Sequence, residues 1–156
     1  MKPCRQQITE RVLGLLESIG VQESTSGEFR AVKVELNRRA PLEENDLPSA
    51  VLFEAAEIPL NDFSSMDLYE FGLVVQIAQK GSGIAAVEFC NTFRADVVKL
   101  LKSDISLGGL VRWLELTDAG DFIGAELPAQ AEGSLLAFLV HYATREGDPY
   151  TFEHLP

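Results

Sequence analysis

Two histidines are the only imidazole groups in the chain, and they are the first candidates for acid–base chemistry. His141 lies in an apolar run between Val140 and Tyr142, and no motif places a serine or cysteine nucleophile beside it. His154 lies in a terminal stretch, where a rigid catalytic geometry is difficult to maintain. The patterns GxSxG and HExxH are absent. The sequence therefore predicts no catalytic residue, and we expect a protein that is not an enzyme.

Metal and redox chemistry have equally little support. Cys4 and Cys90 form no CxxC motif and no Cys/His cluster, which disfavours a structural zinc site. We expect two free thiols in a reducing compartment, and a disulfide between them is the less favoured alternative. The acidic run Glu43-Glu44-Asn45-Asp46 is typical of a solvated loop. A metal site there would need further ligands that the sequence does not identify, so no metal or cofactor is expected.

Two segments, residues 80–83 and Arg38-Arg39, are candidates for binding an anion. Lys80-Gly81-Ser82-Gly83 lies between a predicted strand and a predicted helix, but it lacks the spacing of a phosphate loop. We interpret it as a turn in which Ser82 caps the helix. Arg38-Arg39 is a candidate basic patch of only two charges. A net charge of −11 argues against binding nucleic acid or an anionic membrane through bulk electrostatics.

The length of 156 residues predicts one domain, residues 1–156, with a sizeable core. The first seven residues lack the apolar segment of a signal peptide. No run approaches about 18 apolar residues, the length of a membrane-spanning helix. We therefore expect no membrane contact and a cytoplasmic protein.

Hydrophobic periodicity defines the elements that position these residues. Apolar side chains recur at three- and four-residue steps over residues 6–19 and 84–103, which predicts two helices. Strands are predicted from β-like runs, with the one at 50–57 ended by Pro59. The strand ranges are 29–36, 50–57, 67–79, 111–116, a shorter one at 122–127, and 135–144.

The predicted order is α-β-β-β-α-β-(β)-β. It favours an α+β fold with two helices packed on one face of a mostly antiparallel, twisted sheet. Strands and helices do not alternate regularly, so a doubly wound nucleotide-binding fold is disfavoured.

Several segments, taken in order, resemble the tail-terminator and minor tail proteins (minor tail protein U type) of long-tailed bacteriophages and prophages. The likeness covers most of the chain, from the first helix to Phe152, and depends on order and spacing because each segment is degenerate. The segments are 34–43, 46–52, 69–75, Leu107-Gly108-Gly109-Leu110-Val111, 140–144 and 147–150.

The resemblance implies a small α+β protomer that assembles as a ring, commonly a hexamer, on the end of the tail tube. Such a ring stops tube polymerisation and joins the head, so the implied partners are further copies, the tail tube protein and head–tail connector proteins. It implies a place in the virion tail after assembly in the cytoplasm, no specific nucleic-acid binding, no cofactor and no catalysis. The family defines no catalytic motif to transfer.

Three segments are candidate ring contacts, because a heterologous interface needs parts that reach a neighbour. They are the loop 37–48, the connection 60–66 and an extended C-terminal arm at 147–156. Deleting the arm is expected to leave the fold intact and to weaken self-association. Two alternatives remain open: a neck or head–tail connector subunit, and a small cytoplasmic enzyme or ligand-binding domain with a site between helices and sheet.

Overall fold

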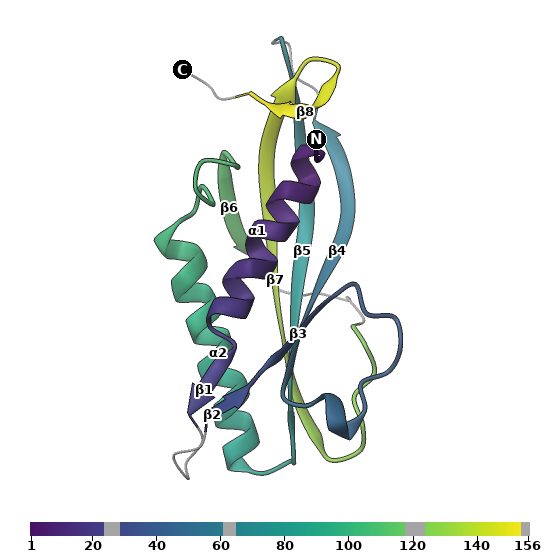
Figure 1. Ribbon diagram of the computed structural model, residues 1–156, viewed down its shortest axis with the longest axis vertical. Helices are drawn as coiled ribbons and strands as arrows, with labels where there is room; N and C mark the ends of the chain where they lie inside the picture. Colours follow the sequence, from purple (N-terminus) through teal and green to yellow (C-terminus); the bar gives the residue numbers. More distant parts are fainter. Residues whose placement is uncertain (24–28, 61–64, 118–123, 154–156) are drawn as a thin grey trace.

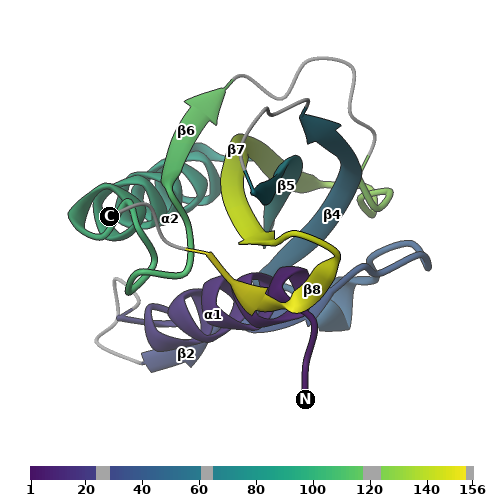
Figure 2. The same cartoon turned by 90° about the horizontal axis from the view of Figure 1, so that it is seen from above.

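The computed structural model describes residues 1–23, 29–60, 65–117 and 124–153. Two helices, α1 (Cys4–Ser18) and α2 (Ile84–Ser103), lie on the same face of a strongly curled sheet (Figure 1, Figure 2). The predicted α+β class, with two helices on a mostly antiparallel sheet, is confirmed.

The main sheet has six strands in the order β3-β4-β5-β7-β6, with β8 paired to the end of β7. Only β3 and β4 are parallel; every other pair is antiparallel. A separate hairpin joins β1 to β2. The bounds are β1 (Val21–Glu23), β2 (Phe29–Ala31), β3 (Lys33–Leu36), β4 (Ser49–Leu60), β5 (Met66–Lys80), β6 (Trp113–Thr117), β7 (Ala131–Arg145) and β8 (Asp148–Phe152), with a short 3-10 helix, η1 (Glu44–Asp46).

The main core lies between the helices and the sheet. Both helices bury residues at the predicted spacing, including Ile8 and Val12 from α1 and Phe93 and Val97 from α2. They pack against alternate residues of the central strands. The fully buried members of the sheet include Leu52, Phe71, Leu73, Val75, Ile77, Phe138 and Val140.

The lower part of the opposite face is covered by loops instead of helices. Leu42 and Ala125 pack there against Val51 and Ala78. The Gln76 side chain fixes this cover, because its Nε2 donates to the Ala125 carbonyl and its Oε1 accepts from the Ala125 N–H, both at 2.6 Å. Both sheet faces therefore contribute apolar residues to a core.

A β-bulge interrupts β4 between Glu54 and Glu57, opposite Gly72 of β5. A Cβ atom on Gly72 would lie 3.1 Å from the Ala55 Cβ, closer than side chains normally approach. The missing side chain at Gly72 therefore leaves room for the extra residue on the neighbouring strand.

Glycines also set the turn between α2 and β6. Leu107, Gly108 and Gly109 all have positive φ, and the Leu107 side chain is fully buried. Two successive glycines make this left-handed run possible beside the buried leucine.

Some predicted boundaries were wrong. Pro59 does not end its strand, because β4 continues to Leu60 at the edge of the sheet, where proline is tolerated. The strand at 29–36 is two strands that meet at Val32, and β1 was not predicted. Residues 124–127 form no strand, and the rest of the predicted strand at 122–127 lies outside the described residues. The N-cap of α2 is Gly83, without a side-chain cap, so Ser82 does not cap it.

The extended C-terminal arm is also a wrong prediction over the part that the structure describes. Gly147, with φ of 71°, allows a hairpin, and β8 folds back to pair with β7 of the same chain. Phe152 packs against the main core, with its ring centroid 6.4 Å from that of Tyr142. Residues 148–152 therefore belong to the folded body, and the remainder beyond Glu153 lies outside the described residues.

Replacing Phe152 with alanine tests this assignment. The side chain is partly buried, so we expect a loss of about 1–2 kcal/mol in the free energy of unfolding. Tyr150, two residues earlier on β8 and 44% exposed, is the matched control, and Tyr150→Ala is expected to change stability by less than about 0.5 kcal/mol. Urea denaturation measures both, and an unchanged midpoint for Phe152→Ala would contradict the assignment.

Candidate functional site

The structure places His141 on the sheet face away from the helices. Its ring stacks on Trp113 with centroids 4.4 Å apart, and its Nε2 lies 3.4 Å from the Glu70 carboxylate. The three residues occupy one cross-strand row of β5, β7 and β6. This is a packed histidine beside one carboxylate, which is no catalytic triad. His154 lies outside the described residues.

The thiols are poorly suited to chemistry. Cys4 and Cys90 are free and buried, and burial raises the pKa of each to about 11. A thiol that stays protonated at neutral pH is a weak nucleophile and a weak metal ligand. Over the described ranges, no three histidine, cysteine, aspartate or glutamate side chains are grouped to hold a metal ion.

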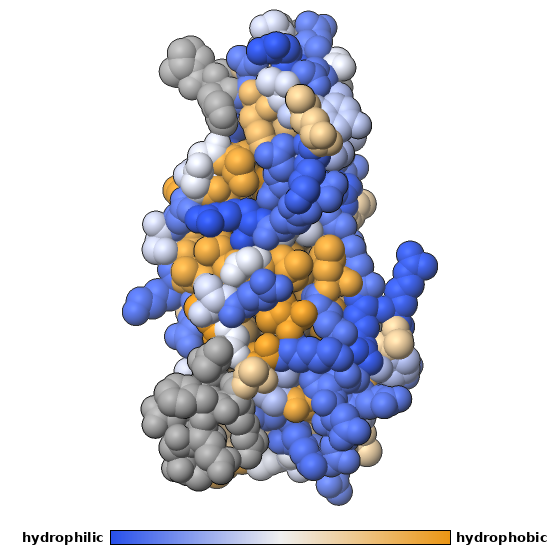
Figure 3. All heavy atoms as spheres, in the orientation of Figure 1, coloured by the Kyte–Doolittle hydropathy of each residue, from blue (hydrophilic) through white to orange (hydrophobic). Residues whose placement is uncertain are grey.

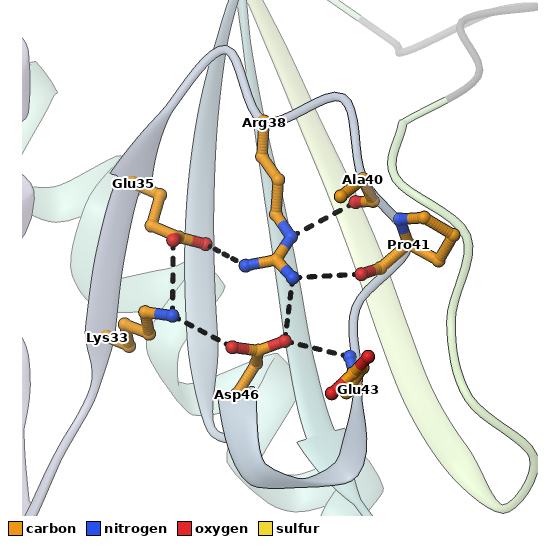
Figure 4. A network of polar contacts seen from close by, with 7 residues as sticks. All are labelled: Lys33, Glu35, Arg38, Ala40, Pro41, Glu43 and Asp46. Carbon is orange, nitrogen blue, oxygen red and sulfur yellow. Dashed lines mark hydrogen bonds and ion pairs between the residues drawn. The ribbon is translucent and has the colours of Figure 1, made fainter.

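The most organised polar cluster is centred on Arg38 in the loop 37–48 (Figure 4). Its guanidinium donates to the Glu35 carboxylate and to the Asp46 carboxylate, each at 2.7 Å. It also donates to the carbonyls of Ala40 and Pro41, at 3.1 and 2.9 Å. One side chain thus joins β3, the loop that follows it and η1.

Asp46 is the second centre of this cluster. Its carboxylate accepts from Lys33 Nζ at 2.8 Å and from the Glu43 N–H at 2.9 Å. The bonds from Lys33 and from the Glu43 backbone, with the nearby charge of Arg38, lower the pKa of Asp46 to about 2. The acidic run is therefore not simply a solvated loop.

The same contacts remove the proposed basic patch at Arg38-Arg39. Arg38 and Lys33 are balanced by Glu35 and Asp46, so the cluster carries no net charge. A hollow of about 460 Å³ lies beside it, lined by Arg38, Arg39, Pro41, Phe53 and residues 124–126. Because Arg38 is already held by its partners and Glu126 opposes Arg39, the hollow lacks the charge to select an anion.

A second polar cluster closes the edge of β4 just beyond the end of β3. The Asn37 Oδ1 accepts from the Glu54 N–H at 2.9 Å, and Asn37 N–H donates to the Leu52 carbonyl at 2.7 Å. Arg5 of α1 donates to the Ala55 carbonyl at 3.0 Å. These side chains occupy the places that a neighbouring strand would otherwise take.

The edge of β4 beyond the bulge is also closed to pairing with another strand. Successive residues of β4 direct their backbone N–H groups alternately toward β5 and away from it, and the Glu54 N–H points away. The bulge adds one residue and so shifts this alternation by one position, which makes the backbone nitrogen of Pro59 point away from β5 as well. Proline has no N–H to donate, so the upper edge of β4 resists pairing with another strand.

Carboxylates behind this edge are held by α1 and β7. Burial opposes ionisation of Glu54, yet hydrogen bonds from Thr9 and Asn37 and the charge of Arg5 keep its pKa lowered. Tyr142 donates to Glu57 at 2.6 Å, and burial followed by this bond raises the tyrosine pKa. The sequence carried no signal for these contacts, since the partners lie 17 to 85 residues apart.

The three predicted contact segments lie in different places. The loop 37–48 covers the lower part of the sheet, whereas the end of β4, the start of β5 and strand β8 lie at the opposite end (Figure 1). Residues 61–64 of the connection lie outside the described residues. The structure therefore does not bring these three segments together into one site.

The low pKa of Asp46 predicts a pH-dependent contribution to stability. A carboxyl whose folded pKa lies below its ordinary value of 3.8 stabilises the fold above that value. The contribution is then lost as the pH falls toward about 2. Asp46→Asn is expected to be less stable than the parent protein at pH 6, with the difference shrinking as the pH falls from about 4 to about 2.

Urea denaturation at a series of pH values measures this difference. The control is Glu44→Gln, because Glu44 pairs with Lys80 across a fully hydrated contact in which both side chains are 64% exposed. A constant gap between Asp46→Asn and the parent over that pH range would contradict the prediction.

Comparison with known proteins adds no assignment: no protein-family model and no curated protein matches the chain. No helix within the described ranges is long and apolar enough to span a membrane.

Proposed function

We propose that this chain is a structural protomer of a phage or prophage tail, similar to a tail terminator, that forms a ring capping the tail tube and joining it to the head. The observation that carries the proposal is the architecture: two helices on one face of a curled sheet whose two terminal strands, β3 and β6, differ and each pair with only one strand in the described residues. That architecture agrees with the small α+β protomer that the resemblance implies.

A sheet with two different edges offers the two surfaces that a ring contact needs. A heterologous contact uses two different surfaces of the same chain, and it closes into a ring when the rotation between neighbours is suitable. In the described residues, β3 pairs only with β4 and β6 pairs only with β7. The protomer thus offers two distinct edges, one at each side of the sheet.

The charge is compatible with a passage for DNA. The net charge of −11 gives the copies a negative field, and a negative lumen repels DNA so that it slides without adhering. We propose no catalysis, no cofactor and no specific contact with bases. The proposed partners are further copies of the chain, the tail tube protein and a head–tail connector protein, with the virion tail as the final location.

A neck or connector subunit is the closest alternative, because it is also a ring-forming structural protein. A ligand-binding domain is less favoured. Its best site, the hollow beside Arg38, offers only Arg39 and Glu126 as charged groups without assigned partners among the described residues, and these oppose one another.

The proposal predicts a ring of discrete size. Native mass measurement of the purified chain, alone and with phage tail tubes, is expected to give a closed assembly. Six copies of 17.1 kDa correspond to about 103 kDa. Electron microscopy of tubes mixed with the chain is expected to show caps at one tube end and a halt in tube growth.

Two results would separate the alternatives. Rings that bind the connector but neither cap tubes nor stop their growth would identify a neck subunit. A chain that remains monomeric both alone and with tubes would contradict the structural proposal. A gene that lies among genes for metabolic enzymes would contradict it as well.

A further inference from the structure

The sheet face away from the helices carries an exposed apolar side chain at each end of one cross-strand row. The row of Glu70, His141 and Trp113 continues to Ile58 of β4, which pairs with Glu70. Ile58 is 53% exposed and Trp113 is 43% exposed. Strands β4 and β6 lie on opposite sides of the molecule (Figure 1, Figure 2), three strand spacings or about 14 Å apart along the sheet. Each of the two side chains is therefore free to meet a neighbouring copy.

Trp113 is held in place before any such contact forms. Its ring stacks on His141, and the guanidinium carbon of Arg112 lies 5.5 Å from the centre of the same ring. A side chain that is already ordered loses little rotamer freedom when a partner covers it. Tryptophan is also enriched among the residues that dominate the binding energy of interfaces. Trp113 thus has the features of an interface anchor.

The upper half of β4 offers a small apolar patch at the other side of the sheet. Leu60 lies on the same face as Ile58 and is 37% exposed. Arg5, Asn37 and Pro59 close this edge to strand addition, so a contact here must use side chains. On the helix side, the surface over the upper half of β4 is mostly hydrophilic, as the upper right margin of Figure 3 shows. The apolar patch is therefore confined to the face away from the helices.

Charge indicates which side of the chain another copy can approach. Residues 84–117, from α2 to β6, contain four basic and four acidic residues, so the whole net charge of −11 lies on the rest of the chain. Within the part of the chain that the structure describes, Arg94, Lys99 and Lys102 of α2 form no ion pair. We call residues 84–117 the α2–β6 side. The acidic body of a second copy meets no net repulsion there.

We propose that Trp113 of one copy packs against Ile58 and Leu60 of the next, so that the α2–β6 side of each copy faces the upper edge of β4 of its neighbour. The inference rests on the proposed ring, and it names the two surfaces that hold the ring together. A contact between two different surfaces is heterologous and can be repeated around a ring. Neighbouring sheets then meet through apolar side chains and not through strand pairing.

Two variants that each damage one surface test this contact. Trp113→Glu and Ile58→Glu place a charge in an apolar contact, so each is expected to raise the concentration at which rings form by at least about tenfold. Native mass measures this concentration for the chain alone, and the concentration that caps half of the tail tubes measures it on tubes. Urea denaturation checks that each variant is folded, and Trp113→Ala and Ile58→Ala repeat the test without a new charge.

The matched control is Tyr150→Glu. Tyr150 is 44% exposed, as Trp113 nearly is, but it lies on β8, outside both surfaces. This variant receives the same new charge and is expected to leave the concentration for ring formation unchanged.

Mixing the two damaged variants tests whether the two surfaces bind each other. The Ile58→Glu copy keeps an intact Trp113, and the Trp113→Glu copy keeps an intact Ile58, so one sound contact forms between them. The next contact cannot form, because the remaining surfaces are both damaged. We expect a dimer of two 17.1 kDa copies, about 34 kDa, and no ring, at a concentration where each variant alone is monomeric.

Fluorescence reports on the same contact directly, because Trp113 is the only tryptophan in the chain. Burial of its exposed part in a ring formed by the chain alone is expected to shift the emission to shorter wavelength. Quenching by acrylamide is expected to fall relative to the Ile58→Glu monomer.

The outcomes separate this inference from the proposed function. A ring that tolerates both Trp113→Glu and Ile58→Glu, or in which Trp113 stays as accessible as in the monomer, overturns the contact and leaves the ring standing. Assembly that is lost with Trp113→Glu alone, or a mixture that gives no dimer, overturns the pairing of these two surfaces. A chain that stays monomeric, alone and on tubes, overturns both the contact and the ring.

Discussion

The pairing of β5 with β7 is the constraint on which the rest of the molecule depends. The two strands pair without a register shift from Met66 opposite Arg145 to Lys80 opposite Ala131. This uninterrupted ladder fixes which residues face the helices and which face away, because a slip by one residue would exchange the two faces. The helices, the covering loops and the short outer strands all attach to faces that this ladder defines.

The next strand outward shows how much irregularity the ladder tolerates. β4 follows β5 closely in its lower half, then bulges opposite Gly72 and continues through Pro59 to Leu60. Asn37 and Arg5 bind the backbone at the point where β3 ends and the bulge begins. Native sheets use such bulges, prolines and side-chain caps to prevent uncontrolled edge pairing. One stretch of the sheet edge is thus closed by side chains of the same protein.

The sequence predicted what local periodicity determines. Both helices and the central strands were recognisable because their apolar residues recur every three to four or every two positions. It could not predict the Arg38 cluster, since Glu35, Asp46 and Lys33 become partners only when η1 folds against β3. It failed at Pro59 and β8 for a related reason. Whether a proline lies on an outer edge, and whether a tail folds back, depends on tertiary neighbours.

The internal ion pairs also bear on the proposed ring. Lys33, Arg38 and Arg5 bind carboxylates within the same chain, so few cations remain to balance the excess of 24 acidic over 13 basic residues. In the proposed ring, the net charges of neighbouring copies oppose association over about one Debye length, which is 10 Å at 0.1 M salt. Stable association needs contacts that do not depend on net charge. In the proposed ring, that need falls to backbone hydrogen bonds and to apolar side chains.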